Sequence, residues 1–357
     1  MSVMKIQSNV RDYTVNFQET SFFLAGLERF PQRLFVIDEN VWKHHGMGCL
    51  STIPPAERLI FPVSEERKNL DSVMEIYDRL MECSAKKNMT LISIGGGVIQ
   101  DLTGFVASTL YRGLHWIFIP TTLLAQADSC IGSKTSLNYK RFKNLVGTFY
   151  PPAEVHIYPP FIKTLGESDF LSGFGEVAKL HIMGGAETTQ ELVNNLSLIM
   201  RRDETALLQA IRNSLAIKLS YMDGDEFDTG RRNLLNFGHC FGHALETVSN
   251  YAIPHGQAVI IGMLFANLAA VRRGWLDGDL ARHLNDALLL KSLSVPLREE
   301  YFSLAPILEA MKQDKKRVGN GLVMVLMKKD YELVKINDFS EEELLPGIKE
   351  LLEILGV

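Results

Sequence analysis

The sequence predicts an α/β protein, with a doubly wound, mainly parallel, Rossmann-like sheet in its N-terminal half and a mainly α-helical C-terminal domain. In the first half, short apolar runs alternate with helix-length segments, as in strands joined by crossover helices. From about Gly166 the apolar residues recur at helical spacing, and strand patterns nearly vanish. This change of texture predicts two domains, 1–165 and 166–357.

Each element follows from its own pattern. Continuous apolar runs predict strands at 33–40 (RLFVIDEN), 58–63 (RLIFPV), 90–97 (TLISIGGG), 115–120 (HWIFIP) and 155–160 (VHIYPP). The helical period predicts helices over 70–86, from about Val98, and over 167–183, 188–200, 204–222, 231–248, 256–273 and 277–291. Strands are expected at 322–327 and 332–336, and a surface amphipathic helix over 340–355.

Composition excludes several classes of protein. The chain has 357 residues with 37 Lys and Arg against 42 Asp and Glu, a net charge of −5, which disfavours nucleic-acid binding. No apolar stretch reaches the roughly 20 residues of a membrane-spanning helix, and the first residues lack the apolar core of a secretory signal. The four scattered cysteines form no CxxC pair. We therefore expect a cytoplasmic location, without nucleic-acid or membrane partners.

The glycines at 95–97 end an expected strand, and Asp101 lies on the helix expected to follow. Glycines there let a backbone approach a pyrophosphate, and the helix N-terminus offers N–H donors. Ligands of open α/β sheets bind at this end of the strands. Because the run is not GxGxxG, a simple tight turn is an equal alternative. Asp38 and Asn40, after another strand, could bind ribose hydroxyls or cap a loop.

Histidines cluster in the segment NFGHCFGH, which contains His239 and His243, and in the following PHG, which contains His255. The first two are four residues apart and share one helix face. Two such imidazoles could hold a divalent metal with His255 and a carboxylate, or could be a hydrogen-bonded core pair. The segment is not HExxH, which disfavours a zinc protease.

Charged residues in apolar surroundings form three further candidates. Glu176 and Lys179 lie three residues apart on an otherwise apolar helix, as either a site or a surface ion pair. A polar run from Thr121 to Asn144 reads as one loop with an anion pocket, or as a solvated face. The segment from Asp225 to Arg232 precedes Asn236. Arg232 and Asn236 are expected to align with His239 and His243 on one helix. Alternatively, the segment is a helix start with capping carboxylates and a solvated arginine.

Taken together, these segments resemble the sugar phosphate cyclases, and most closely the 3-dehydroquinate synthase family. The matching pieces run in the family's order over residues 95–316: GGGVIQDLTGFVAS, YRG, PTTLLAQADSCIGSKTSLN, KNLVGTFYPP, GFGEVAK, RRNLLNFGHCFGHALE, PHGQAV and MKQDKK. Weaker matches at 38–40 (DEN) and 65–68 (EERK) extend the resemblance over most of the chain.

The resemblance implies the cofactors NAD and Zn²⁺, with Co²⁺ as a possible substitute, and a set of site residues. The implied zinc ligands are Glu176, His239 and His255, with His243 turned to the substrate phosphate instead. The implied substrate residues are Lys134, Asn144, Lys179, Lys218, Arg232, Asn236, His243 and one of Lys315 and Lys316, with Arg112 reaching a partner subunit in a homodimer. The implied NAD residues are Asp38, Asn40, Glu65, Lys68, Gly95, Gly96, Asp101, Thr121, Thr122, Asp128, Lys143 and Thr164.

The implied substrate is a small anionic sugar phosphate. The implied reaction oxidises a hydroxyl to a ketone, eliminates phosphate, returns the hydride and closes a carbocycle by an aldol-type step, so that NAD is not consumed. In 3-dehydroquinate synthases the substrate is 3-deoxy-arabino-heptulosonate 7-phosphate.

The sequence departs from the family pattern at several positions. Gln100 stands where Gly is usual, Ser133 where Gly is usual, Gln257 where Glu is usual, and LHI follows Lys179 where YGI is usual. A cyclase of glucose 6-phosphate or sedoheptulose 7-phosphate is therefore an alternative, as is a metal-dependent polyol dehydrogenase. The lysine cluster disfavours the dehydrogenase. The intact Glu176, His239 and His255 set disfavours a silent binding module.

Overall fold

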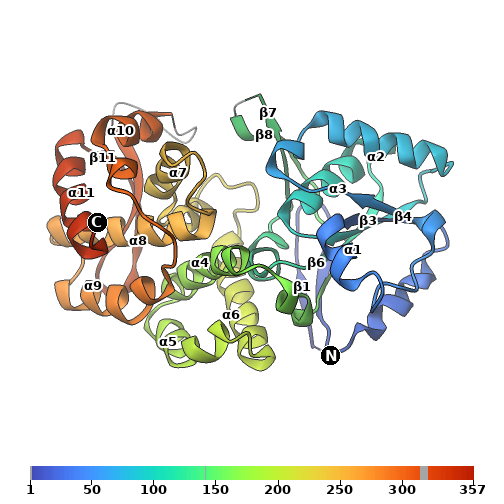
Figure 1. The fold of residues 1–357 in the computed structure, drawn as a ribbon, viewed down its shortest axis with the longest axis horizontal. Helices are drawn as coiled ribbons and strands as arrows, with labels where there is room; N and C mark the ends of the chain where they lie inside the picture. Colours follow the sequence, from blue (N-terminus) through green and yellow to red (C-terminus); the bar gives the residue numbers. More distant parts are fainter. Residues whose placement is uncertain (1, 141, 314–320) are drawn as a thin grey trace. The chain divides into compact units, whose positions relative to one another are not determined.

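A mostly parallel sheet organises the first part of the chain in the computed structural model, which describes residues 2–140, 142–313 and 321–357. The described chain divides into two units, 1–165 and 166–357. The first is the expected α/β unit, and the second is mainly helical with one small hairpin (Figure 1). The predicted fold class is thus confirmed.

The first unit contains the strands β1 (Ser2–Ile6), β2 (Tyr13–Phe17), β3 (Arg33–Asp38), β4 (Arg58–Phe61), β5 (Thr90–Gly95), β6 (His115–Pro120), β7 (Lys134–Tyr139), β8 (Phe142–Phe149) and β9 (Glu154–Ile157). Its α-helices are α1 (Glu39–His45), α2 (Leu70–Glu82) and α3 (Gly97–Thr109). The main sheet has the order β1-β2-β9-β6-β5-β3-β4, and only the β1–β2 pair is antiparallel. Strands β3, β4, β5, β6 and β9 confirm the five sequence predictions.

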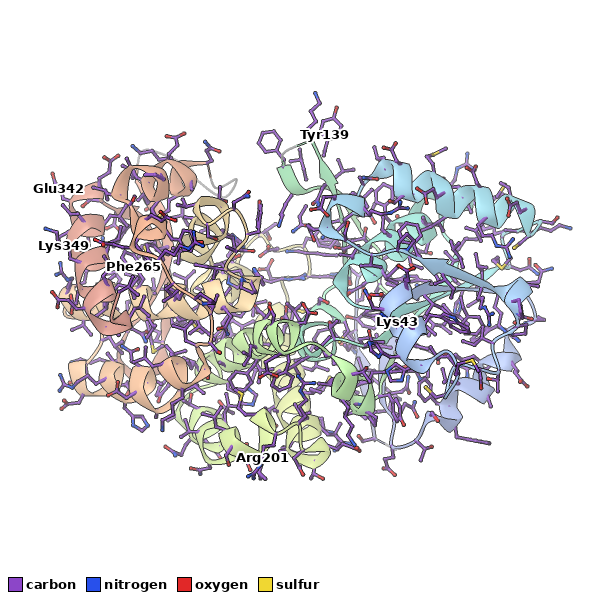
Figure 2. The ribbon with its side chains drawn as sticks, viewed as in Figure 1. Lys43, Tyr139, Arg201, Phe265, Glu342 and Lys349 are labelled. Carbon is purple, nitrogen blue, oxygen red and sulfur yellow. The ribbon has the colours of Figure 1, made fainter. Side chains whose placement is uncertain are left out.

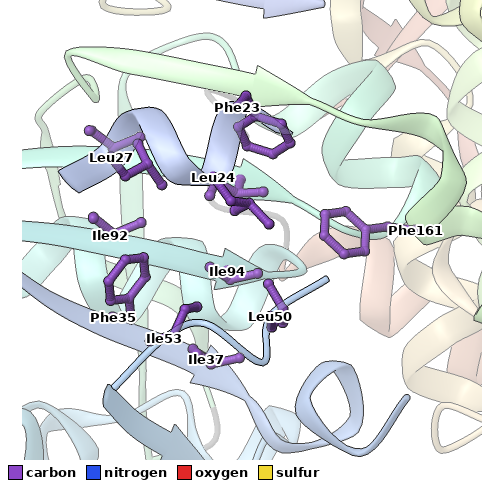
Figure 3. Packing of buried hydrophobic residues seen from close by; sticks show 12 residues of the cluster. Phe23, Leu24, Leu27, Phe35, Ile37, Leu50, Ile53, Ile92, Ile94 and Phe161 are labelled. Atoms are coloured by element: carbon purple, nitrogen blue, oxygen red, sulfur yellow. The ribbon is translucent and has the colours of Figure 1, made fainter. Parts of the chain in front are cut away.

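Successive residues of a strand face opposite sides, so the apolar runs of β3, β5 and β6 supply both faces of the sheet. One face packs against the 3₁₀ segment Ser21–Arg29 and nearby loops, as Figure 3 shows. Its buried cluster is Phe23, Leu24, Leu27, Phe35, Ile37, Leu50, Ile53, Ile92, Ile94, Ile117, Ile119 and Phe161. The helix α3 packs against β5 and β6.

The connections of the sheet reverse direction between two central strands. From β3 the chain moves outward to β4, whereas from β5 it moves to β6 on the other side. The carboxyl ends of β3 and β5 therefore flank the topological switch point, where open α/β sheets bind ligands.

The polar run predicted as one loop is instead an antiparallel hairpin, β7–β8. Thr135 and Leu137 are buried on one side of β7, which packs against α3. Their alternation with polar residues is the period of a half-buried strand, and the polar residues concealed it. Figure 2 shows Tyr139 at the tip of this hairpin, where it is exposed.

The second unit contains the helices α4 (Glu167–Met183), α5 (Ala186–Met200), α6 (Glu204–Met222), α7 (His239–Val248), α8 (His255–Arg272), α9 (Gly278–Leu284), α10 (Leu304–Lys312) and α11 (Glu341–Leu355). Its hairpin joins β10 (Leu322–Met327) and β11 (Leu333–Phe339). The helix α8 is buried on all sides from 256 to 270, as expected of a central helix. Phe265 stacks on Phe241 of α7, with ring centroids 4.1 Å apart.

The prediction of one helix over 231–248 is wrong, because the helix is interrupted in its middle. A 3₁₀ segment, Arg231–Asn236, ends at Phe237, and Gly238 takes a left-handed conformation with φ 77° before α7 begins. A Cβ on Gly238 would lie 2.7 Å from the backbone oxygen of Val259, so this close turn requires glycine. The expected continuous face joining Arg232 and Asn236 to His239 and His243 therefore does not form. The predicted helix 277–291 likewise gives way to a π-helical turn after Leu284.

In the described part of the chain, no helix combines the length and apolar character that crossing a membrane requires.

Candidate functional site

A close crossing of two helices builds one candidate site in the second unit. A Cβ on Gly175 of α4 would lie 2.1 Å from the backbone oxygen of Gly256 in α8, and one on Gly256 would lie 1.7 Å from that of Ser172. Only glycines permit this approach. It places Glu176, the next residue of α4, against His255, the first residue of α8. Gly175 inside the helix α4 thus has a packing reason.

Glu176, His239 and His255 come together at this crossing from α4, α7 and α8. Oε1 of Glu176 lies 3.3 Å from Nε2 of His239 and 3.2 Å from Nε2 of His255. The three residues form a group whose ligand atoms all lie within 4.8 Å of one another. Two ligand atoms about 2.1 Å from one tetrahedral ion lie roughly 3.4 Å apart, so these residues fit a zinc ion.

Lys179 favours the ionised form of Glu176. Its Nζ lies 2.5 Å from Oε2 of Glu176, and both side chains are buried, so the pair is not the surface ion pair considered above. Burial by itself raises the pKa of Glu176, but Lys179 and His239 hold it well below its usual value. Glu176 is therefore an anion with Oε2 engaged and Oε1 facing the two imidazoles.

Glu246 of α7 orients His255. Its Oε2 lies 3.1 Å from Nδ1 of His255, whose Nε2 faces Glu176. Although burial lowers the pKa of His255, hydrogen bonds to Glu176 and Glu246 raise it to about 10. With Glu246 holding the Nδ1 proton, a metal ion that binds displaces the proton from Nε2, the nitrogen that faces Glu176. The sequence analysis missed Glu246, although it lies three residues after His243 on the same helix face.

His243 is exposed on α7, and its ring centroid lies 5.2 Å from that of His239 and 5.8 Å from that of His255. With Glu246 and His255 it forms a second possible metal-holding group. The more buried group contains Glu176 instead. Among the described residues, neither metal-holding group contains both His239 and His243, so the pairing that their spacing suggests is not reproduced.

The remaining cationic candidates of this unit lie on neighbouring elements. Lys218 is buried on α6, which packs against α4. Arg232 is buried, and its backbone N–H donates to Oδ2 of Asp225 over 2.8 Å. The amide of Asn236 donates to the backbone oxygen of Asn233 over 2.7 Å. Lys315 and Lys316 lie outside the described residues.

A second candidate site lies at the switch point of the sheet in the first unit. Gly95 ends β5 beside Asp38, so that an added Cβ would lie 3.1 Å from Cβ of Asp38. A Cβ on Gly96, before α3, would lie 2.8 Å from Cγ2 of Thr122. The helix α3 begins at Gly97, where an added Cβ would meet nothing within 4 Å. This open cradle at a helix N-terminus suits a pyrophosphate.

Asp38 is buried, and burial raises its pKa despite a hydrogen bond that it accepts from the backbone of Asn40. Thr121 and Thr122 directly follow β6, and Thr121 donates its backbone N–H to the oxygen of Gly95 over 3.0 Å. The carboxyl ends of β3, β5 and β6 thus carry these residues side by side.

The other predicted residues of this unit lie on several elements. Glu65 and Lys68 lie in and after the 3₁₀ segment Glu65–Arg67, and Nζ of Lys68 lies 2.7 Å from Oδ2 of Asp101 on α3. The remaining ones are Asp128 after β6, Lys134 on β7, Lys143 and Asn144 on β8, Arg112 after α3 and Thr164 after β9. Thr164 and Arg112 are exposed.

Two of the departures from the family pattern, Gln100 and Gln257, make local hydrogen bonds, whereas Ser133 has a conformation that favours the usual glycine. Gln100 on α3 exchanges hydrogen bonds with Ser129, and both are 2.6 Å long. Gln257 on α8 donates to the backbone oxygen of Ser292 and accepts from the backbone of Ser294. Ser133 has φ 63°, a left-handed conformation that glycine adopts more easily.

Comparison with known proteins identifies the family. The family model for the 3-dehydroquinate synthase N-terminal domain matches residues 58–172, and that for the C-terminal domain matches residues 173–317. The chain is 39% identical to a 3-dehydroquinate synthase of Clostridium tetani, over 89% of this chain and 85% of that one. It is 34% identical to a 3-dehydroquinate synthase of Acetivibrio thermocellus, over 99% and 100% of the two chains.

A solved structure shares the fold. ValA, a 2-epi-5-epi-valiolone synthase from Streptomyces hygroscopicus, matches with a TM-score of 0.85 over 98% of this chain and 99% of that one, at 23% identity. Both sequence models and the full-length relatives agree, and the chain belongs to the 3-dehydroquinate synthase family.

Proposed function

We propose that this protein is an NAD- and zinc-dependent sugar phosphate cyclase that converts 3-deoxy-arabino-heptulosonate 7-phosphate to 3-dehydroquinate with loss of phosphate. The observation that carries the proposal is the group of buried Glu176 with the half-buried His239 and His255 in a chain of this family. The ValA structure contains NAD⁺ and Zn²⁺, which supports the same two cofactors here. Co²⁺ accepts the same nitrogen and oxygen ligands and is a possible substitute.

The metal-binding residues have distinct tasks. When bound, zinc acidifies a substrate hydroxyl and NAD accepts and returns the hydride. Lys179 keeps Oε2 of Glu176 engaged, which leaves Oε1 as the ligand atom. Glu246 holds His255 with Nε2 toward the same point. His243, exposed beside them, is then available to the phosphate rather than to the metal.

The anionic substrate requires cations that are held in place. We assign this task to Lys134, Lys179, Lys218, Arg232 and His243, with one of Lys315 and Lys316, and assign neutral hydrogen bonds to the substrate to Asn144 and Asn236. Buried Lys218 and Arg232 present positive charge at low local dielectric, where binding of a phosphate or carboxylate is strongest. Asp225 fixes the backbone at Arg232, so this cation is positioned before the substrate arrives.

The first unit supplies the dinucleotide site in this proposal. Gly95 and Gly96 admit the pyrophosphate at the N-terminus of α3, and Asp38 accepts hydrogen bonds from ribose hydroxyls. The further NAD contacts are assigned to Asn40, Glu65, Lys68, Asp101, Thr121, Thr122, Asp128, Lys143 and Thr164. Their support is that most of them follow the carboxyl ends of the parallel strands β3, β4, β6 and β9, while Asp101 lies on α3 and Lys143 on the hairpin.

The proposed enzyme is a cytoplasmic homodimer. In the described chain, none of the four cysteines forms a disulfide, as in a reducing compartment. Arg112 is exposed in a turn where it and Tyr111 both have positive φ. We assign Arg112 to the site of a partner subunit.

Phosphate release without net NADH tests the function. Protein with zinc, a catalytic amount of NAD and 3-deoxy-arabino-heptulosonate 7-phosphate should release many equivalents of phosphate per NAD, while absorbance of NADH stays flat. NADH growing with turnover would indicate a polyol dehydrogenase instead. Turnover only of sedoheptulose 7-phosphate or glucose 6-phosphate would indicate another cyclase, which Ser133 beside Lys134 makes a specific alternative.

A further inference from the structure

One asparagine ties the β7–β8 hairpin to the segment that carries Glu65 and Lys68. The side-chain amide of Asn138 donates to the backbone oxygen of Glu65 over 3.0 Å and to its Oε1 over 2.8 Å. The backbone N–H of Asn138 donates to the oxygen of Lys68 over 2.7 Å. The proposed NAD residues Glu65 and Lys68 thus hold β7 directly.

The same side chain also holds the proposed substrate residue of β8. Oδ1 of Asn138 accepts the backbone N–H of Asn144 over 2.9 Å. Asn144 has φ 51°, a left-handed conformation that asparagine adopts more readily than other non-glycine residues, and Asn138 holds its backbone N–H there. Asn138 therefore joins Glu65 to Asn144 through the two ends of one amide group.

A second chain of contacts runs in parallel. Lys68 pairs with Asp101 over 2.7 Å, and Asp101 accepts hydrogen bonds from the backbone and the hydroxyl of Ser136, each 2.9 Å long. The hydroxyl oxygen of Ser136 also lies 2.9 Å from Oδ1 of Asn144. Both routes start at the segment 65–68 and end at Asn144.

These ties add to the packing of β7 against α3 and bear on the exposed side of the hairpin. The hairpin forms a two-stranded sheet separate from the main sheet, and two strands alone are marginally stable in water. Lys134 and Asn144, which stand on it, are both exposed side chains. The contacts of Asn138 and Ser136 connect the segment 65–68 to Asn144 on this exposed side.

We infer that Asn138 is a positioning residue that couples NAD binding to the affinity for the sugar phosphate. NAD bound at Glu65 and Lys68 restrains the segment 65–68, and Asn138 transmits this restraint to the backbone of Asn144. The inference rests on the proposed function, because that proposal assigns Glu65 and Lys68 to NAD and Asn144 to the substrate.

The experiment measures the ratio of the Kd of a substrate analogue without NAD to its Kd with saturating NAD. The probe is a phosphonate analogue of 3-deoxy-arabino-heptulosonate 7-phosphate, in which a methylene group replaces the bridging oxygen and prevents phosphate elimination. Titration calorimetry on the zinc-loaded protein gives its Kd without NAD and with saturating NAD. We expect NAD to tighten binding in the wild type by at least about fivefold, the usual lower size of such coupling.

Two variants and one control separate coupling from folding. Asn138→Ala should reduce the NAD-dependent tightening at least about fivefold, or abolish it. Asn138→Asp keeps the acceptor for Asn144 but sets a carboxylate against Glu65, so it should lose the tightening as well. Thr148→Ala alters a contact inside the same hairpin, since the hydroxyls of Thr148 and Thr135 lie 2.7 Å apart, and should keep the wild-type ratio.

The outcomes are distinct. If the wild type turns over and both Asn138 variants keep its ratio of Kd without NAD to Kd with NAD, the coupling is overturned and the proposed function stays intact. Equal loss of the ratio in Thr148→Ala also overturns it, because the effect would then belong to the hairpin as a whole. Restoration of the ratio by Asn138→Asp would contradict the route through Glu65. Wild-type protein that neither binds NAD nor releases phosphate refutes the proposed function itself.

Discussion

At the scale of single residues, Glu176 is the carboxylate of the metal group. Its Oε1 faces two imidazoles while its Oε2 pairs with Lys179. Glu176→Gln removes the charge that both need, and we expect zinc affinity to fall at least about 100-fold in a chelator competition. Glu246→Gln, which keeps an acceptor for His255, should lose less, and exposed Glu187→Gln should lose nothing. Full zinc affinity in Glu176→Gln would refute the ligand assignment.

His181 makes the stability of the second unit depend on pH. It is buried on α4 with Nδ1–H donating to the oxygen of Val177, and burial lowers its pKa from 6.5 to about 4. The unfolded chain therefore binds the proton first, so stability is complete above pH 6.5 and is lost as pH falls toward 4. Denaturant titrations should show up to about 3 kcal/mol of this loss in the wild type and not in His181→Ala. Identical pH profiles would contradict it.

At the scale of elements, the crossing of α4 and α8 sets the metal group. Gly175→Ala would place a Cβ 2.1 Å from the backbone oxygen of Gly256, where no flexible side chain can move aside. We expect a loss of about 1–3 kcal/mol in unfolding free energy, together with weaker zinc binding. Gly278→Ala on α9 meets nothing within 4 Å and should be neutral or slightly stabilising. Equal behaviour of the two variants would contradict the crossing.

Elements differ in how far sequence reveals them. The strands β3, β5 and β6 are buried on both faces, so their apolar runs are visible. The strands β2 and β7 alternate buried with partly exposed residues, so they have no continuous apolar run and were not predicted from the sequence. The break at Gly238 depends on one left-handed residue packed against α8, which no periodicity reports. Spacing alone paired His239 with His243, and the apolar surroundings marked Glu176 as a candidate, but only the resemblance assigned Glu176 to the metal.

At the scale of the whole molecule, the two candidate sites belong to different units, and their ligands should bind through separate residues. Gly96→Ala would set a Cβ 2.8 Å from Cγ2 of Thr122. We expect NAD affinity to fall at least about tenfold, equivalent to about 1.4 kcal/mol, while zinc affinity is unchanged. Calorimetric titrations with each ligand check this. Parallel loss of zinc affinity would show that the variant disturbs the whole fold.

The metal group is the claim on which the proposed chemistry depends most, and diffraction from zinc-loaded crystals at the zinc absorption edge tests it directly. The account predicts one anomalous peak, about 2.0–2.2 Å from Oε1 of Glu176 and from Nε2 of His239 and His255. A peak held instead by His243 and Glu246, with Glu176 still paired only to Lys179, would contradict it.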